Sequence, residues 1–378
     1  LAEALGMSLT GCAAIPAPYR ERGQMAYDTG YKSVELVIKD IKPTDIMTKE
    51  AFQNAIVTAS AIGASTNAPP HINAIAKHLN IEVTLEDWEN WGEEIPLLVN
   101  LQPAGEFLGE GFFHAGGVPV VMNELHKKNK LNNNTLTVSG KSISENLKDI
   151  KKSENIIIKD YEEPLKEKAG FLVLRSNFFD TAIMKISVVS NEFKERYLSN
   201  KKHPMEFTLK AIVFDGPEHY HEEINNPKLK IDENCMLIIR GCGPIGYPGA
   251  AEVVNMQPPD YLLKKGVTSL PCLGDGRQSG TSESPSILNV SPEAAVGGGL
   301  SIIKNYDLVK VILNKKRVDL LIDDKEIKNR FKEIKFNCPE NQTPWQEISR
   351  QYTGQLEDGA CLDLKEGYFS VAQSKGIP

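Results

Sequence analysis

The sequence predicts an α/β protein with a helix-rich first part and a β-rich second part built as a barrel or sandwich. In residues 1 to about 130, helical patterns alternate with short apolar runs, which is typical of α/β layering. From Gly170 onward, short apolar runs rich in β-branched residues follow one another with few helices between them, as in β-barrels and sandwiches. At 378 residues the chain is long enough for two domains with sizeable cores.

The helix-rich part is expected to contain helices and one short strand. Apolar residues at helical spacing predict helices over Glu21–Lys39, Thr48–Ile62, Pro70–Leu79 and Thr84–Trp91, and an apolar run predicts a strand over Ile95–Asn100. Leu131–Asn155 is rich in Asn, Ser, Lys and Thr, which makes it the best candidate for a linker or junction. The predicted domains are therefore residues 1–155, a β-rich domain over 156–330 and a C-terminal tail over 331–378.

The β-rich part is predicted from its apolar runs, which are bounded by turn residues. The expected strands are FLVLRS (171–176), AIMKISVV (182–189), FTLKAIVF (207–214), CMLIIRG (235–241), LVKVILN (308–314) and RVDLLID (317–323). The tail is polar, with one helical stretch near Trp345–Tyr352.

Two glycine-rich runs in the β-rich part are the strongest candidates for a site. They are RGCGPIGYPGAAE (240–252) and LGDGRQSGTSESPSILNVSPEAAVGGGL (273–300). Glycine lets a backbone turn tightly and approach a ligand closely, although such runs also form plain turns. Gly241, Gly243 and Gly246 give the spacing GxGxxG, but Tyr247–Gly249 interrupts the helix that a dinucleotide site needs after it.

Composition and charge exclude several classes of protein. A net charge of −7 offers no basic stripe for nucleic acid. No apolar run of about 18 residues predicts a membrane span, and the start lacks a secretory signal pattern, so we expect a cytoplasmic protein. Six scattered cysteines without a CxxC pair indicate reduced thiols rather than a disulfide framework. His219 and His221 are the only close histidine pair, and we expect no metal there.

Several segments, taken in order, resemble one enzyme family. They are GCAAIPAPYRERGQMAYDTG (11–30), GASTNAPPHINAIAKH (63–78), NLQPAGEFLGE (100–110), the two glycine-rich runs, and TPWQEISRQYTGQLEDGACLDL (343–364). The family is that of the iron-sulfur dehydratases, which contains dihydroxy-acid dehydratase, phosphogluconate dehydratase and the pentonate (arabinonate or xylonate) dehydratases. The motifs GRQSGTS and TPWQE most resemble those of the sugar-acid branch.

The resemblance implies a fold and an activity. The expected fold is the remnant of an α/β/α N-terminal domain followed by a β-barrel-like C-terminal domain, in a homodimer or homotetramer. The implied activity is that of a hydro-lyase that removes water from a small 2,3-dihydroxy sugar acid to give a 2-keto-3-deoxy acid. The implied cofactors are an iron-sulfur cluster and Mg²⁺.

The resemblance also implies roles for three residues. By the position of the GRxSG motif, Ser279 is the base that takes the C2 proton, and Thr281 beside it contacts substrate. Glu252, after the GPxGxPG run, is a ligand of Mg²⁺. From the residues alone, Ser279 is equally compatible with a hydroxyl in a turn, and Glu252 with an acid that begins a helix.

The family's cluster cysteines have no counterpart among the six cysteines of this chain. The first residue is Leu, and Leu1–Ser8 is typical of the last turns of a helix. We therefore expect an N-terminally truncated piece of a longer protein that does not assemble the cluster or turn over substrate by itself. The alternatives are a dihydroxy-acid dehydratase of branched-chain amino-acid biosynthesis and a non-catalytic remnant that acts as a binding protein.

Overall fold

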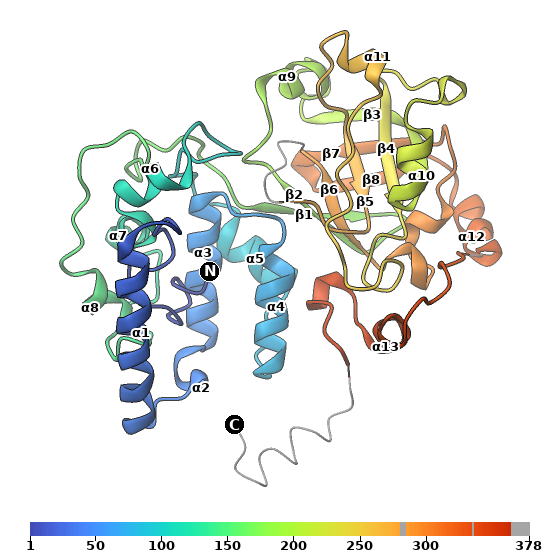
Figure 1. Cartoon of the computed structure of the whole chain (residues 1–378). Coiled ribbons are helices and arrows are strands. Elements are labelled where there is room, and N and C mark those ends of the chain that lie inside the picture. The colour runs from blue at the N-terminus through green and yellow to red at the C-terminus, as the bar shows by residue number, and fades with distance from the viewer. Residues whose placement is uncertain (280–284, 335, 364–378) are drawn as a thin grey trace.

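The chain folds into a helical part and a closed β-barrel, which lie side by side (Figure 1). This computed structural model describes residues 1–279, 285–334 and 336–363. The fold is therefore mixed α/β, with the named strands of the described residues confined to the barrel. None of the described helices is both long enough and apolar enough to cross a bilayer.

The helical part consists of eight helices. They are α1 (Arg20–Ile38), α2 (Pro43–Ile46), α3 (Lys49–Ile62), α4 (Ala68–His78), α5 (Leu85–Gly92), α6 (Gly109–His114), α7 (Gly117–Lys127) and α8 (Ile143–Leu147). The buried centre is α3, whose N-cap Thr48 accepts a hydrogen bond from the Ala51 N–H and whose C-cap Gly63 has a φ of 70°. Both are standard ways to satisfy the free backbone groups at helix ends.

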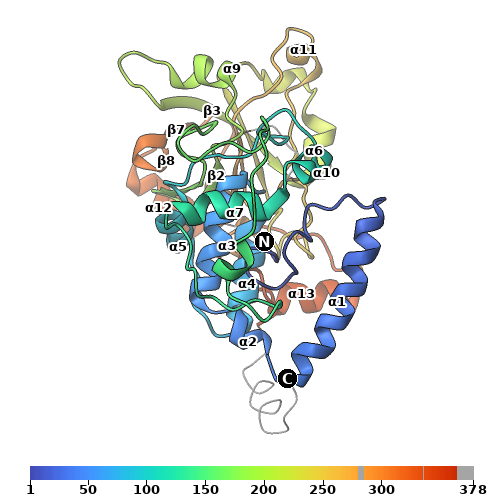
Figure 2. The ribbon, with the colours of Figure 1, turned by 90° about the vertical axis from the view of Figure 1, so that its left-hand side faces the viewer.

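Helix α1 stands at the edge of the helical part (Figure 2) and has no buried residue. By contrast, Ile143 and Leu147 of α8 are buried in the same core as α3 and α5. The segment 131–155, expected to be a linker or junction, thus contributes packed side chains to the helical part.

The barrel contains eight strands in the closed order β1-β2-β6-β5-β4-β3-β7-β8. The strands are β1 (Phe171–Ser176), β2 (Thr181–Lys185), β3 (Glu206–Asp215), β4 (Cys235–Arg240), β5 (Cys272–Gly274), β6 (Ile287–Ser291), β7 (Leu308–Ile312) and β8 (Arg317–Leu320). The strands β3, β4, β5 and β6 are neighbours in parallel pairs. The carboxyl ends of these strands therefore open on the same edge of the barrel.

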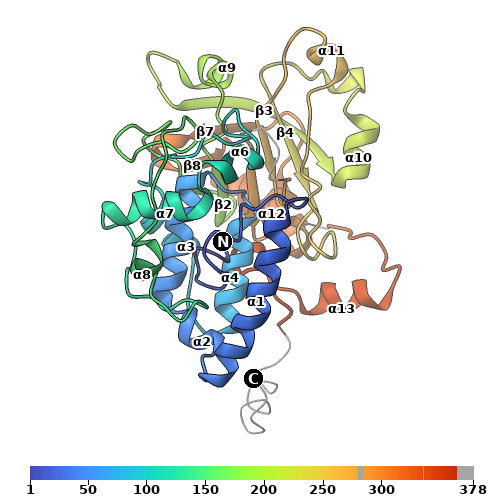
Figure 3. The same ribbon diagram turned by 60° about the vertical axis from the view of Figure 1, so that its left-hand side comes forward.

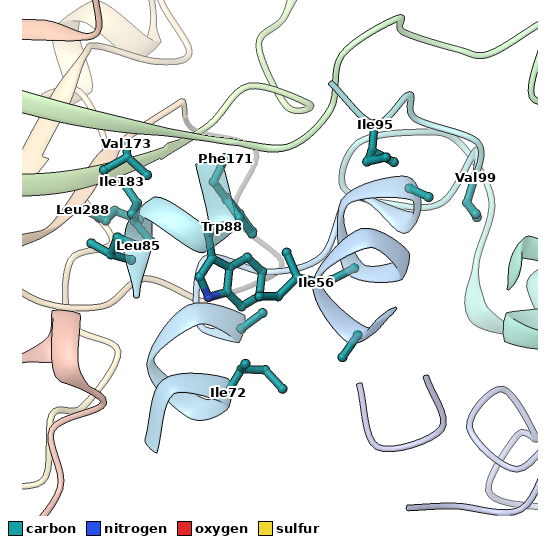
Figure 4. Packing of buried hydrophobic residues seen from close by; sticks show 14 of the residues in the cluster. Ile56, Ile72, Leu85, Trp88, Ile95, Val99, Phe171, Val173, Ile183 and Leu288 are labelled. Carbon is teal, nitrogen blue, oxygen red and sulfur yellow. The ribbon is translucent and has the colours of Figure 1, made fainter. Parts of the chain in front are cut away.

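In the strands β1, β2, β3 and β4, alternate residues belong to two cores, as the period of a β-strand requires. One set, including Leu172, Met184 and Ile238, fills the barrel. The other set, including Phe171, packs against the helices. Figure 4 shows Trp88 of α5 close to Phe171 of β1, with ring centroids 5.6 Å apart, and the Trp88 indole N–H donates to Asn73 Oδ1 at 3.0 Å.

The remaining helical elements lie in the segments that connect and follow the barrel strands. They are α9 (Asn191–Phe193), the π-helix η1 (Lys194–Leu198), α10 (Gly216–Glu223), α11 (Asp260–Leu263), α12 (Asp324–Glu333), α13 (Pro344–Tyr352) and the short 3₁₀ turns η2 (Pro227–Leu229), η3 (Ala294–Val296), η4 (Gly299–Ile302), η5 (Leu313–Lys315) and η6 (Leu356–Asp358). Helix α10 lies against β3 and β4 on the flank of the barrel (Figure 3).

Most sequence-predicted elements are confirmed within a few residues, and two are wrong. Ile95–Asn100 is extended but makes only isolated bridges, such as Leu97 with Lys166 and Val99 with Ile158. No strand lies beside it to form a sheet among the described residues. Leu1–Ser8 forms hydrogen-bonded turns instead of a helix end. The short strands β5, which overlaps the start of the second glycine-rich run, and β6, which lies within that run, were not predicted.

Candidate active site at the glycine-rich loops

The first glycine-rich run and the described start of the second form neighbouring loops at the carboxyl ends of β4 and β5. The β4 loop (residues 241–252) follows Arg240, and the β5 loop (residues 275–286, of which 275–279 and 285–286 are described) follows Gly274. Because β4 and β5 are parallel partners, with Ile239 opposite Gly274, the loops leave the barrel side by side. In parallel sheets, ligands bind at this edge.

Two buried carboxylates hold the β4 loop, and we call Asp275 and Glu293 the carboxylate clamp. Asp275 accepts hydrogen bonds from the backbone N–H groups of Gly241, Cys242 and Ala294 at 2.8–2.9 Å. Glu293 accepts from the N–H groups of Ile245 and Gly246 at 3.0 and 2.8 Å. The carboxylate clamp thereby satisfies backbone donors that helix or sheet would otherwise satisfy.

Burial dominates the ionisation of the clamp. It raises the pKa of Glu293 to about 7, against the opposing effect of the backbone hydrogen bonds from Gly246 and Ile245. It also raises the pKa of Asp275, which is fully buried, and the hydrogen bond from Ala294 is the largest opposing effect. The charged form of each carboxyl is thus disfavoured by desolvation and favoured by the loop N–H groups.

Two glycines allow the loops to approach this closely. A Cβ at Gly243 would lie 2.5 Å from Glu293 Cδ, and a Cβ at Gly276 would lie 2.6 Å from Cys242 Cβ. Glycine is therefore required at both positions for close packing. Residues 247–249 continue as a turn with no helix after Gly246, so the loop does not have the geometry of a dinucleotide site.

Asparagine side chains connect the two candidate catalytic residues, Glu252 and Ser279. The amide of Asn67, just before α4, donates to Glu252 Oε1 and, at 3.2 Å, to Gln278 O. The amide of Asn255 donates to Glu252 O at 2.9 Å, and its oxygen accepts from the Ser279 N–H at 3.4 Å. Each asparagine thus bridges the β4 region and the β5 loop.

Arg277 adds positive charge on the side facing the helical part. Its Nε donates to Ala250 O at 2.7 Å, and its Nη1 lies 3.4 Å from His71 Nε2 and 3.5 Å from Asn67 Oδ1. It makes no ion pair with a described residue. The site therefore lies between the barrel and the start of α4, and both parts of the chain contribute polar groups to it.

Ser279 lines an open hollow of about 1190 Å³. The polar side chains of the lining include the amides of Asn225, Asn255 and Gln257, the hydroxyls of Ser187, Ser190, Thr268, Ser269 and Tyr220, the charged groups of Lys166, Glu192 and Asp260, and His221. Such a lining presents amides and hydroxyls that can bind the hydroxyl groups of a small polar ligand.

The structure brings together two of the three predicted site residues. Ser279 and Glu252 are both bonded to Asn255, whereas Thr281 lies outside the described residues. Sequence analysis did not identify Asn67, Asn255, Asp275 or Glu293 as site residues. A signal existed for two of them, because Asn67 lies in the GASTNAPPH segment and Asp275 is the single acid between the glycines at the start of the β5 loop.

No group of three or more His, Cys, Asp or Glu side chains gathers around one point in the described ranges. No disulfide joins any two of the six cysteines in the described ranges, and Cys235, Cys242, Cys272 and Cys361 are buried. Burial raises the pKa of Cys235 to about 11 and raises that of Cys242 still further, which disfavours the thiolate that metals require. His219 and His221 lie on α10 rather than on a strand or loop.

Comparisons with known proteins match both parts of the chain. The model of the dihydroxy-acid/6-phosphogluconate dehydratase N-terminal domain matches residues 1–146, and the corresponding C-terminal model matches residues 156–360.

Curated relatives match along nearly the whole chain. D-xylonate dehydratase of Caulobacter vibrioides is 56% identical over 372 residues, which cover 98% of this chain and 62% of the relative. L-arabinonate dehydratase of Rhizobium leguminosarum is 40% identical over 375 residues, covering 99% of this chain and 63% of the relative. Dihydroxy-acid dehydratase of Acetivibrio thermocellus is 37% identical over 374 residues, covering 97% and 64%. The chain thus spans less than two thirds of the length of these relatives.

Proposed function

We propose that this chain, which belongs to the dihydroxy-acid/6-phosphogluconate dehydratase family, carries part of the active site of a hydro-lyase that dehydrates a sugar acid. The observation that carries the proposal is the joining of Ser279 and Glu252 through Asn255 at the edge of the barrel. The product is a 2-keto-3-deoxy acid, formed when the enol left by the loss of water takes its keto form.

Ser279 is the proposed base for the C2 proton. A free hydroxyl is too weak a base at neutral pH, so Ser279 needs a nearby cation that stabilises its alkoxide. Its backbone N–H is held by Asn255, which fixes the start of the side chain relative to Glu252. Thr281, two residues on, is proposed to contact the substrate.

Glu252 is the proposed ligand of Mg²⁺. A carboxylate suits this cation, which prefers oxygen ligands and keeps several waters when the protein supplies few. When bound, Mg²⁺ would act as a Lewis acid that stabilises the charge building on the substrate carboxylate as the C2 proton leaves. Asn67 holds one oxygen of Glu252 and so orients the other toward a ligand.

The described cysteines do not fit an iron-sulfur cluster. They are dispersed, and no three of them gather with other ligand side chains in residues 1–279, 285–334 and 336–363. A cluster of the family type would need thiolates from elsewhere, and no step proposed for the residues of this chain passes through one.

A sugar acid is favoured over a branched dihydroxy acid by two observations. Identity is 56% to a D-xylonate dehydratase and 37% to a dihydroxy-acid dehydratase. The hollow beside Ser279 presents amides and hydroxyls among its lining side chains, and these groups bind a polyol better than they bind the methyl groups of a branched acid. The α/β/α character of residues 1–155, the domain division and a homodimer or homotetramer remain predictions.

The substrate assay uses the protein as its gene encodes it, loaded with Mg²⁺ and iron. D-xylonate, L-arabinonate and a branched 2,3-dihydroxy acid are offered separately, and 2-keto acid formation is followed by mass spectrometry. The proposal expects a pentonate to give the highest kcat/KM. Preference for the branched acid would replace the proposal with the biosynthetic alternative, and turnover of none would leave a non-catalytic binding protein.

A further inference from the structure

Lys166 and Ser187 lie together in the wall of the Ser279 hollow, and two further lysines, Lys185 and Lys194, belong to the surroundings of Lys166. Lys166 lines the hollow, and its ammonium donates to the backbone oxygen of Ser187, which also lines it. Lys185, at the end of β2, is only 7% exposed. Lys194 begins η1 and is exposed.

These lysines lack acidic partners. No Asp or Glu of the described residues forms an ion pair with Lys166, Lys185 or Lys194, whereas the nearby Lys168 pairs with Glu94. A buried ammonium without a counter-ion is unfavourable. The hydroxyl of Ser187 is likewise buried without a hydrogen-bond partner.

The ionisation of these lysines agrees with this geometry. Burial lowers the pKa of Lys166, and the charge of Lys194 lowers it further. Burial lowers the pKa of Lys185 to about 8, with a further contribution from the charge of Lys166. The positive charges of these lysines thus disfavour one another, and an anion bound at Lys166 would offset that repulsion.

We propose that Lys166 and the unpartnered hydroxyl of Ser187, which line the Ser279 hollow together, form an oxyanion subsite in its wall. The ligand is a small oxyanion, either the carboxylate of an acid bound in the hollow or a free inorganic anion. The acids that also line the hollow leave the subsite open, because Glu192 is paired with Arg196 at 2.9 Å and Asp260 pairs with none of the three lysines. Of these two ligands, only the carboxylate of a bound acid depends on the proposed dehydratase function; binding of a free inorganic anion does not.

The test is binding of inorganic sulfate, measured by isothermal titration calorimetry on the protein as its gene encodes it. This readout needs no turnover, so its failure is distinct from failure of the dehydratase proposal. Lys166→Met should weaken sulfate binding by about tenfold or more, since a charge-assisted hydrogen bond is lost. Lys168→Met, a substitution of the same kind at an exposed lysine, should leave the affinity unchanged.

Two further variants keep the test decisive if Lys166→Met does not fold. Lys166→Arg retains the charge and should retain sulfate binding. Lys194→Glu changes an exposed side chain and should weaken binding, because it places a carboxylate beside Lys166. Wild-type affinity in Lys166→Met or Lys194→Glu would overturn the subsite.

Competition with D-xylonate then distinguishes the two sources of the anion. Mutual exclusion of sulfate and D-xylonate identifies the sugar-acid carboxylate as the ligand. Simultaneous binding of both identifies a separate inorganic anion site.

Discussion

Substituting Glu293 by Gln removes the charge that forms beneath the β4 loop when the pH rises through about 7. In the wild type, burial raises the pKa of this carboxyl from 4.5 to about 7. The folded protein therefore holds the proton more tightly than the unfolded chain does. The resulting stabilisation is fully present below about pH 4.5 and is lost as the pH rises through about 7.

The magnitude follows from that difference in pKa. At about 1.4 kcal/mol per unit, the wild type should lose about 2.5 kcal/mol of unfolding free energy between about pH 5 and pH 8 through Glu293 alone. The variant has no such titration. In the variant, the side-chain NH₂ group faces the N–H of Gly246 or Ile245, and two donors cannot bond to each other. The resulting loss of stability is independent of pH.

Urea unfolding followed by tryptophan fluorescence measures both proteins at the two pH values. The unfolding free energy of Glu293→Gln should fall less with pH than that of the wild type, by about 2.5 kcal/mol. Taking the difference between the two proteins cancels the contributions of the groups that do not interact with Glu293, whereas the charge of Asp275 acts on Glu293 and belongs to the measured effect. Equal pH dependence in the two proteins would refute the assignment of a buried, proton-holding carboxyl at Glu293.

Two further substitutions test how the site is held. Gly243→Ala should lower the unfolding free energy by about 2 kcal/mol and reduce activity, because its Cβ would lie 2.5 Å from Glu293 Cδ. Calorimetric melting measures this loss. The control is Gly30→Ala, whose Cβ meets nothing within 4 Å and which should stabilise α1 by about 0.5–1 kcal/mol. Asn67→Ala should weaken Mn²⁺ binding, measured by electron paramagnetic resonance, and lower kcat/KM by about tenfold, because the hydrogen bond that orients Glu252 is lost.

The matched control for the Asn67 variant is Asn123→Ala. Asn123 also donates from its amide to a backbone oxygen, that of Ile150 at 2.9 Å, but within the helical part. An equal loss of metal affinity in both variants would show a general effect on stability instead of a role at Glu252. A Gly243→Ala protein as stable as the wild type would contradict the close packing of the carboxylate clamp.

The barrel strands could be predicted because each is a short apolar run bounded by turn residues, as at Phe171–Ser176, which is a strand with the same bounds. The strand β5 spans only Cys272–Gly274, too few residues for a periodic pattern. The strand predicted over Ile95–Asn100 failed because the sequence specifies an extended, apolar segment but not a neighbour with which it can pair.

The site was predictable only in part, and for a physical reason. Ser279 and Glu252 came from resemblance, since neither spacing nor composition distinguishes them from turn and helix-start residues. Asn67 is 185 positions from Glu252 in the sequence, and only the packing of α4 against the barrel brings the two together. Asp275 has the sequence signature of a turn residue, and its burial depends on three loops that meet around it.

Ser279 is the proposed base of the dehydration site at the glycine-rich loops. The rate of 2-keto acid formation from D-xylonate tests this role in Ser279→Ala, alongside Ser33→Ala, which alters an exposed hydroxyl on α1. We expect Ser279→Ala to lower kcat by about 10²-fold or more and Ser33→Ala to leave it unchanged. Equal kcat in Ser279→Ala, Ser33→Ala and the wild type would contradict this role.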